Sequence, residues 1–494
     1  MKTVKGYPLL LGYIGIFLIL TGIINLIPLV MLIAFPEESV FALNFIIPGV
    51  SSIIIGYLLT LIIRHKEKSR FERFEDSFFL TVMWSLSILV CSVPFLLAGY
   101  DFLQSLFEST SGLSTTGSTV FSAHELPYIY IFFRSVLLFF GGVGLVLVIT
   151  STVSDRYGMR LYTAEGHNDK LMSNLAKSAR LILTIYAGYI LFGTIAFILL
   201  DMPWFDALNH SIAAVATGGF STENLSIGHY DSFLIELVAI ILMLLGATSF
   251  LIHMYLFKGV LKKVFKHGEL YLMIGLVVIF TTIMTFNLYE NQALIDPYGH
   301  HDIWHYLRHS VFTLVSAITT TGLQTVENFH GFTSFSLIMV ASLMVVGGQL
   351  GSTAGALKQG RVVLALQSSY WFIRDKMSHS RTIRTNFMLR NGEYEQVDDV
   401  EIRHNYAFII IYLMILMLGS FIIMSFGHSF EDALFEFASA LGGVGFSTGI
   451  MHYQAPWQVL STGIAGMFIG RLEFTVIIIA IFKLFFDITK KDVR

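Results

Sequence analysis

Long apolar runs separated by short polar segments dominate the chain. Runs at 8–34, 43–63, 77–98 and 407–426 approach or exceed the roughly 20 residues that a helix needs to cross a bilayer. Four other runs are only moderately apolar and too short to span, and each ends in a polar stretch that contains glycine. Such a run predicts a half-helix that enters the membrane and turns back. The pattern predicts an all-α polytopic membrane protein.

The polar stretches recur at similar spacing, which indicates internal repeats. Taking Gly117, Gly219, Gly322 and Gly445 as marker glycines gives separations of 102, 103 and 123 residues. Matched residues precede the markers by eleven positions (Leu106, Leu208, Val311, Leu434), by six (Ser111, Ala213, Ser316, Ser439) and by two (Thr115, Thr217, Thr320, Gly443). Glycines also recur 24–27 positions after them, at Gly141, Gly142, Gly246, Gly347, Gly348 and Gly470.

The repeated unit is therefore a helix, a half-helix, a glycine turn and a second helix. Four units around one pseudo-fourfold pore, preceded by two N-terminal transmembrane helices, give ten predicted spans. The predicted boundaries are 1–75 for the two N-terminal helices, then 76–180, 181–266, 267–404 and 405–494 for the four pore repeats, the third including a broken inner helix and a cytoplasmic segment.

The basic residues fall in alternate hydrophilic segments. Of the 31 Lys and Arg, 28 lie at the N-terminus or in 64–75, 154–180, 258–266, 358–404 and 483–494, and the intervening loops have none. The positive-inside rule then predicts that both termini are cytoplasmic. Arg134, Arg308 and Arg471 are the exceptions. We expect Arg134 and Arg308 to pair with outer acids such as Glu108 or Glu327.

The polar turns have the chemistry of a cation filter. A cation that enters the membrane must exchange its water for oxygen ligands, and rings of backbone carbonyls supply them. Glycine permits the backbone conformation that turns successive carbonyls inward. The alternative is a plain loop at each site, which four matched sites make less plausible. The predicted filter residues are Thr115, Thr116, Gly117, Thr217, Gly218, Gly219, Thr320, Thr321, Gly322, Gly443, Val444 and Gly445.

Other chemistry is sparse. The single cysteine, Cys91, lies in an apolar run, so no intrachain disulfide is possible. No phosphate loop, dinucleotide signature or zinc-peptidase motif occurs, and no catalytic residues or bound cofactor are predicted. His301, His305 and His309 have a spacing that could hold a transition metal, although solvated histidines are the simpler interpretation.

The four turns, the stretch from Gly347 to Gly355 and the Gly470-Arg471-Leu472-Glu473 sequence together resemble the TrkH/KtrB potassium transporter family over nearly the whole chain, with the two extra helices typical of the TrkH branch. The resemblance implies a potassium-conducting subunit of a prokaryotic inner membrane. It also implies a homodimer gated by a cytosolic nucleotide-binding ring of the TrkA/KtrA type. Two departures are Ala356, where the family usually has a second glycine, and Gly443-Val444 in the fourth turn.

A broken third inner helix is predicted where glycines, Gln349, Ser352 and Thr353 interrupt an apolar run. The resemblance makes this segment a gate beneath the filter, with Gly351, Ser352, Thr353 and Gly355 in the loop and Arg471 beside it on the pore. The alternatives are a kinked helix without a gating role and a structural charge at Arg471. We expect carbonyls of the broken helix to be the partners of Arg471.

The sequence thus favours potassium uptake through a four-part filter, with K⁺ as the transported ion. The alternative is a secondary transporter that binds a solute at broken helices and alternates its access. Fourfold repetition of one turn favours the pore, because alternating-access folds usually show two inverted repeats. Segment 367–405, with a turn signal at Asn391-Gly392, is either a small hairpin or partner-docking surface, or a solvated basic loop.

Overall fold

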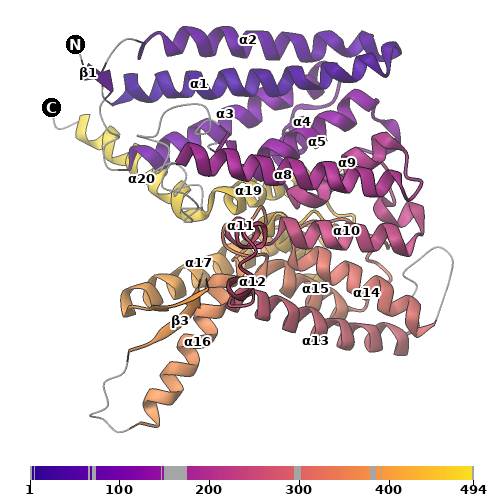
Figure 1. Ribbon diagram of the computed structural model, residues 1–494. Helices are drawn as coiled ribbons and strands as arrows, with labels where there is room; N and C mark the ends of the chain where they lie inside the picture. The colour runs from indigo at the N-terminus through magenta and orange to yellow at the C-terminus, as the bar shows by residue number, and fades with distance from the viewer. Residues whose placement is uncertain are drawn as a thin grey trace.

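Long helices run side by side to form the body of the protein (Figure 1). The protein is described here by a computed structural model, which covers residues 3–4, 6–64, 67–68, 74–145, 147–148, 175–293, 302–326, 328–378, 385–390 and 392–491. Both chain termini and the hairpin β3–β4 lie at the same end of the bundle, which we call the terminal face (Figure 1). The other end is the distal face.

The first two long helices form an antiparallel pair on one side of the bundle. They are α1 (Tyr7–Leu26) and α2 (Ala42–Thr60), joined by the 3₁₀ segments η1 (Ile27–Ile33) and η2 (Pro36–Phe41). A Cβ on Gly15 would collide with the carbonyl of Gly56, because the two backbones approach so closely. Small residues at such contacts are typical of helix packing in membranes.

The rest of the chain forms four units, each with an outer helix, a half-helix and an inner helix. The elements are α3 (Glu75–Leu97), α4 (Phe102–Leu113) and α5 (Tyr128–Val143); α8 (Leu175–Ile198), α9 (Trp204–Ala216), α10 (Phe233–Gly246), α11 (Phe250–Phe257) and α12 (Leu261–Val264); α13 (Gly268–Glu290), α14 (Ile303–Ile318), α15 (Ser334–Val346) and α16 (Gln359–Lys376); and α17 (Asp399–Met424), α18 (Phe430–Gly442), α19 (Trp457–Leu472) and α20 (Phe474–Lys491). Short 3₁₀ segments η3 (Ala123–Glu125) and η4 (Ser226–Tyr230) follow the first two half-helices, and β1 (Thr3–Val4) pairs with β2 (Glu67–Lys68).

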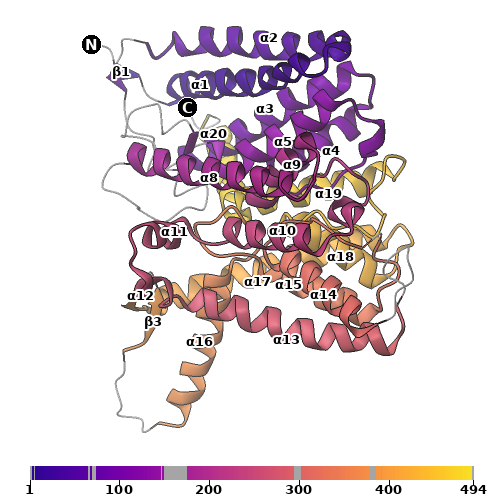
Figure 2. The ribbon, with the colours of Figure 1, turned by 45° about the vertical axis from the view of Figure 1, so that its right-hand side comes forward.

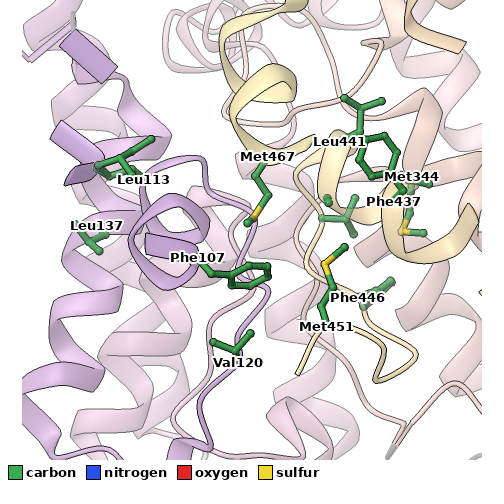
Figure 3. Packing of buried hydrophobic residues seen from close by; sticks show 14 of the residues in the cluster. Phe107, Leu113, Val120, Leu137, Met344, Phe437, Leu441, Phe446, Met451 and Met467 are labelled. Carbon is green, nitrogen blue, oxygen red and sulfur yellow. The ribbon is translucent and has the colours of Figure 1, made fainter. Parts of the chain in front are cut away.

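The units close into a ring because each inner helix packs against the half-helix of the next unit. The contacts join α5 to α9, α10 to α14, α15 to α18 and α19 back to α4. At the closing seam, Phe107 of α4 and Met467 of α19 approach each other between the first and fourth units (Figure 3). The predicted fold class, four such repeats after two N-terminal helices, is confirmed.

The inner helices differ from prediction in where they break. The sequence indicated one broken inner helix, the third. The structure also bends the second by 105° between α10 and α11 and the fourth by 97° between α19 and α20. In the described part of the chain, six helices are long and apolar enough to span, and the two bent pairs and the shorter α5 and α15 supply the remaining predicted spans. Apolarity alone did not reveal the bends, because both halves of each bent helix are apolar.

Segment 367–405 contains a hairpin, as one of the sequence-based alternatives predicted, and Asn391 of the turn signal lies outside the described residues. Strands β3 (Phe387–Arg390) and β4 (Glu393–Gln396) pair antiparallel, and Met388 packs with Trp371 of α16. At its tip, the exposed Lys263 ammonium donates a hydrogen bond of 2.9 Å to Glu393. This bond raises the pKa of Lys263 and lowers that of Glu393.

Candidate functional site: four turns in a ring

The four half-helices end in turns with the same backbone conformation. The residue two positions before each marker glycine is left-handed, with φ of 58° at Thr115, 52° at Thr217, 54° at Thr320 and 67° at Gly443. A β-branched residue at positive φ is a genuine outlier, so the surroundings must impose it. Gly443 stands where the other three turns have threonine. This difference has a physical reason, because glycine adopts without strain the conformation that the threonines are forced to adopt.

Each turn also has the same pair of hydrogen bonds. The amide just before the marker glycine donates to the carbonyl six positions before the marker, at 2.9 Å in all four turns. The amide of the left-handed residue donates to the carbonyl five positions before the marker, at 3.1–3.3 Å, as in a Schellman motif. In two turns the matched serine adds a bond: Ser111 Oγ donates to Ser118 O, and Ser439 Oγ accepts from Gly445 N.

The turns contact one another in cyclic order. The marker glycines face the carbonyls of the next turn so closely that an added Cβ would overlap them, in the order Gly117 to Gly218, Gly219 to Thr321, Gly322 to Val444 and Gly445 to Thr116. Every marker glycine also has positive φ, between 54° and 100°. Glycine is therefore required for its conformation and for the close approach. All twelve predicted filter residues belong to this ring.

Several carbonyls of the ring are available to a ligand. Among the described residues, the carbonyls of Thr116, Thr321, Val444 and the four marker glycines accept no hydrogen bond. Buried carbonyls normally find a partner. A set of unpaired carbonyls from four adjoining turns has the composition of a site for a dehydrated cation.

On the distal side of three turns, the buried side chain nine positions before the marker glycine forms a hydrogen bond with a residue that follows the turn. Glu108 accepts from Thr119 Oγ1 at 2.8 Å, His210 Nε2 lies 2.9 Å from Ser221 Oγ, and Glu436 accepts from Ser447 Oγ at 2.5 Å. Glu436 also accepts from the amides of Thr448 and Ile450. Glu108, His210 and Glu436 were not identified from the sequence as residues that support the turns. The shared offset from the markers was a signal that could have revealed them.

The second set of recurrent glycines lies against the half-helices. An added Cβ at Gly141, Gly246 or Gly470 would overlap the carbonyl four positions before a marker, namely Leu113, Val215 or Leu441. The inner helix of each of these three units therefore approaches its own half-helix at the same point. In the third unit Gly347 instead faces Gly355, because the broken segment intervenes.

The broken third inner helix passes directly beneath the ring. Helix α15 ends at Val346, α16 begins at Gln359, and the segment between them is irregular. Thr353 Oγ1 lies 3.1 Å from Thr217 Oγ1 and donates to Gly246 O at 2.9 Å, and the Gly355 amide donates to Thr320 Oγ1 at 2.9 Å. The predicted loop residues are thus bonded to two of the four turns from the terminal side.

The loop is also tied to the bend in the second inner helix. The Gln349 amide donates to Ala247 O at 3.1 Å, and Gln349 Oε1 accepts from the Ser249 amide at 3.1 Å. The Phe250 amide donates to Gly351 O at 3.0 Å, while Ser352 Oγ donates to Gln349 O at 2.7 Å. Two broken helices therefore satisfy each other's free backbone groups, which the membrane interior requires.

Arg471 lies near the loop and is hydrogen-bonded to the first unit. It shares a cavity of about 30 Å³, enough for one or two waters, with Ser114, Ser352 and Gly355. Its described hydrogen bonds go to Gly141 O, at the end of the first inner helix, and to Thr115 Oγ1 at 3.4 Å. The bonds expected to carbonyls of the third inner helix are not among these two and stay a prediction. Arg471 therefore connects the cavity to the first turn.

Glu473 pairs with the helix that follows the loop. Arg361 Nη2 donates to both carboxylate oxygens of Glu473 at 2.9 Å, and its guanidinium lies 3.9 Å from the ring centroid of Phe408. Glu473 occupies the bend between α19 and α20 with a φ of 56°. Only part of each of the two side chains is exposed, 19% and 17%. The pair holds the third and fourth inner helices together beneath the ring.

Reversing this ion pair tests its role. Arg361→Glu or Glu473→Arg alone places like charges together, and the loss should be on the order of 3 kcal/mol, the low end for buried pairs because both side chains keep some solvent contact. The double reversal should recover most of the thermal stability and of the transport activity. Thermal unfolding and ion flux of the four proteins measure this. If the double variant loses as much stability as the two single variants together, the pairing is contradicted.

The other singled-out charges lie at the distal side. Arg134 donates to Glu108 at 3.3 Å, as expected, and Arg308 pairs with Glu236 and Asp231. Glu327 and His301 lie outside the described residues. His305 and His309 have ring centroids 4.3 Å apart, and His309 Nδ1 lies 2.8 Å from Thr325 Oγ1. The described part of the chain contains no group of three His, Cys, Asp or Glu that could hold a metal ion.

Comparisons with known proteins agree with this architecture. Residues 42–486 match the sequence model of the TrkH family, which is described as a cation transport protein. The chain is 30% identical to the Trk system potassium uptake protein TrkH of Vibrio parahaemolyticus, over 84% of this chain and 86% of that protein. It is 28% identical to an uncharacterized cation transporter of Methanocaldococcus jannaschii, over 98% and 97% of the two chains.

A solved structure has the same fold. The crystal structure of the potassium transporter TrkH from Vibrio parahaemolyticus superposes with a TM-score of 0.83, at 23% identity, over 96% of this chain and 98% of that one. The described helices, half-helices and turns therefore follow a fold already seen in a membrane transporter.

Proposed function

Because this chain belongs to the TrkH family of cation transport proteins, we propose that it is a pore subunit for potassium uptake. The observation that carries the proposal is the closed ring of four turns, in which seven carbonyls of the described residues accept no hydrogen bond. Such a ring suits a cation that passes through, and the repetition favours a pore over alternating access at two inverted halves. Relatives named as potassium uptake proteins support potassium as the ion.

In this proposal the filter consists of the twelve predicted residues, and the gate lies beneath it. Gly351, Ser352, Thr353 and Gly355 form the gate, and Arg471 lies in a cavity that Ser352 and Gly355 also line. The hydrogen bonds of Thr353 and Gly355 to two filter threonines support a closed state. Opening requires these bonds to break, together with those that hold Gln349 to the second inner helix.

The remaining parts of the proposal concern orientation and assembly. The distribution of basic residues supports cytoplasmic termini and therefore a cytoplasmic terminal face. The resemblance to the TrkH/KtrB family implies that the membrane is the inner membrane of a prokaryote. We propose a homodimer that is regulated by a cytosolic nucleotide-binding ring of the TrkA/KtrA type, and the boundaries at 75, 180, 266 and 404 as the limits of the four pore repeats. The hairpin β3–β4 at the terminal face offers a surface to that partner.

Ion uptake into cells that lack their own potassium systems tests the function. Cells that produce the chain with its cytosolic partner should grow at low potassium and accumulate radioactive rubidium, and excess potassium should suppress this uptake more than excess sodium. Cells that produce a Gly322→Ser variant at equal membrane level are the matched control. Failure of folded, membrane-inserted protein to support uptake with or without the partner would overturn the proposal.

A further inference from the structure

An apolar groove opens on the flank of the bundle beside the bent second inner helix. It has a volume of about 580 Å³, and α8, α10 and α11 line it with Leu181, Ile185, Tyr189, Phe192, Leu245 and Phe257. This volume is in the usual range of small-molecule sites. Gly188 forms part of the wall, and a Cβ added there would meet no atom within 4 Å. The groove is therefore open at the center of its α8 wall.

Basic residues surround the end of the groove at the terminal face. Arg180 directly precedes Leu181 on α8, and Lys258 directly follows Phe257, so both lie next to residues that line the groove. Lys177, Lys262 and Lys266 lie further along the same two segments, and all five of these side chains are exposed. Segments 177–192 and 245–266 contain no Asp or Glu. Every charged residue that these two segments contribute to the rim is therefore basic, and these residues favour an anionic group there.

The segment that carries these lysines is suited to a membrane surface. Helix α11 turns away from α10 by 105°, and α11 and α12 lie at the ends of α8 and α13 that belong to the terminal face (Figure 2). Phe257, Leu261 and Phe265 are 68%, 53% and 60% exposed, and lysines alternate with them. Exposed apolar residues mixed with lysines are typical of interfacial segments that bind anionic lipid.

We propose that the groove and its basic rim bind an anionic phospholipid of the cytoplasmic leaflet. One acyl chain occupies the groove, and the phosphate lies between Arg180 and Lys258. The apolar lining excludes free phosphate as the preferred ligand, because free phosphate would leave the groove unfilled. A cytosolic protein partner would contact the lysines, but it would leave the apolar groove unfilled.

The site is coupled to the gate, and this part rests on the proposed function. Leu245 lines the groove, and the next two residues, Gly246 and Ala247, provide the carbonyls that Thr353 and Gln349 bind. A lipid that packs against Leu245 and Phe257 stabilises the bend on which the closed loop depends. Anionic lipid should therefore change flux at constant protein.

Lipid retention measures the binding directly. Detergent-purified protein should carry bound phosphatidylglycerol in native mass spectrometry. Gly188→Leu fills the groove and should lower retention roughly tenfold, whereas Arg180→Gln with Lys258→Gln should lower it on the order of thirtyfold, since each basic residue near an anionic surface contributes about as much as a fivefold change. The matched control is Gly275→Leu on α13, where an added Cβ also meets no atom. Equal retention by Gly188→Leu and Gly275→Leu would overturn the site.

Flux in vesicles separates the possible outcomes. Rubidium flux should differ between phosphatidylcholine vesicles with and without phosphatidylglycerol, and this difference should disappear in Gly188→Leu but not in Gly275→Leu. Soluble glycerol phosphate should not replace the lipid; if it does, the acyl groove is not the site. If substitution of Arg180 and Lys258 leaves lipid retention unchanged and weakens only the binding of a cytosolic protein, the proposal is likewise overturned. If no variant conducts but retention follows the pattern, the proposed function fails and the lipid site stands.

Discussion

Gly322→Ser is expected to reduce potassium-over-sodium selectivity by roughly tenfold. A Cβ at Gly322 overlaps the carbonyl of Val444 in the next turn, and the backbone φ of 81° is strained for any side chain. Overpacking of this kind costs about 1–3 kcal/mol. In the proposed filter the overlap pushes a carbonyl away from the cation, so much of this cost falls on ion binding, and a loss of about 1.4 kcal/mol is tenfold in affinity. Competition of sodium and potassium against rubidium uptake measures the effect.

Gly443→Ala is the control within the same ring. An added Cβ there meets only ordinary contacts, with Ser114 O at 3.8 Å and Thr116 Oγ1 at 3.9 Å, and the other three turns already carry threonine at this position. The left-handed φ should cost it on the order of 1 kcal/mol of stability, but selectivity should be kept. If both variants lose selectivity alike, or neither does, the marker glycines have no special role in the ring.

How much of this site could be predicted depended on whether the pattern repeats. Gly117, Gly219, Gly322 and Gly445 were identifiable because fourfold recurrence is visible in one sequence. The position of the loop followed from Gly347 to Gly355, where glycine and polar residues interrupt an apolar run. The positive φ of the marker glycines was also accessible from the sequence. The left-handed threonines were not, because a β-branched residue rarely adopts that conformation.

What could not be predicted involves contacts between units. The bend at Gly246 to Ser249 is stabilised by Gln349, which lies 100 positions after Ser249 in the sequence. No local feature of an apolar helix indicates such a partner. The Arg361–Glu473 pair joins residues 112 positions apart. Arg471 was recognisable as a costly intramembrane charge, but its bond to the Gly141 carbonyl depends on how the first and fourth units close the ring.

Arg471→Gln is expected to raise cation flux per folded protein by up to about thirtyfold. A fixed positive charge in the cavity repels a cation that leaves the ring. For two unit charges about 8 Å apart at an effective dielectric constant of 20, the repulsion is about 2 kcal/mol. Removing it lowers the barrier to exit by that amount, and about 1.4 kcal/mol corresponds to tenfold in rate. Glutamine was chosen over alanine because its amide can still donate to Gly141 O, which keeps the first turn in place.

Arg471→Lys separates charge from hydrogen bonding. Lysine keeps the positive charge but not the planar set of donors that reaches both Gly141 O and Thr115 Oγ1. It should therefore keep flux low while it lowers the yield of folded protein, the reverse of the glutamine variant. Rubidium flux in vesicles, divided by the folded fraction from size-exclusion chromatography, distinguishes the two. A glutamine variant whose normalised flux stays at or below that of the unmodified protein would show that Arg471 only braces the first turn. Selectivity should change little in either variant, because the ring itself is intact.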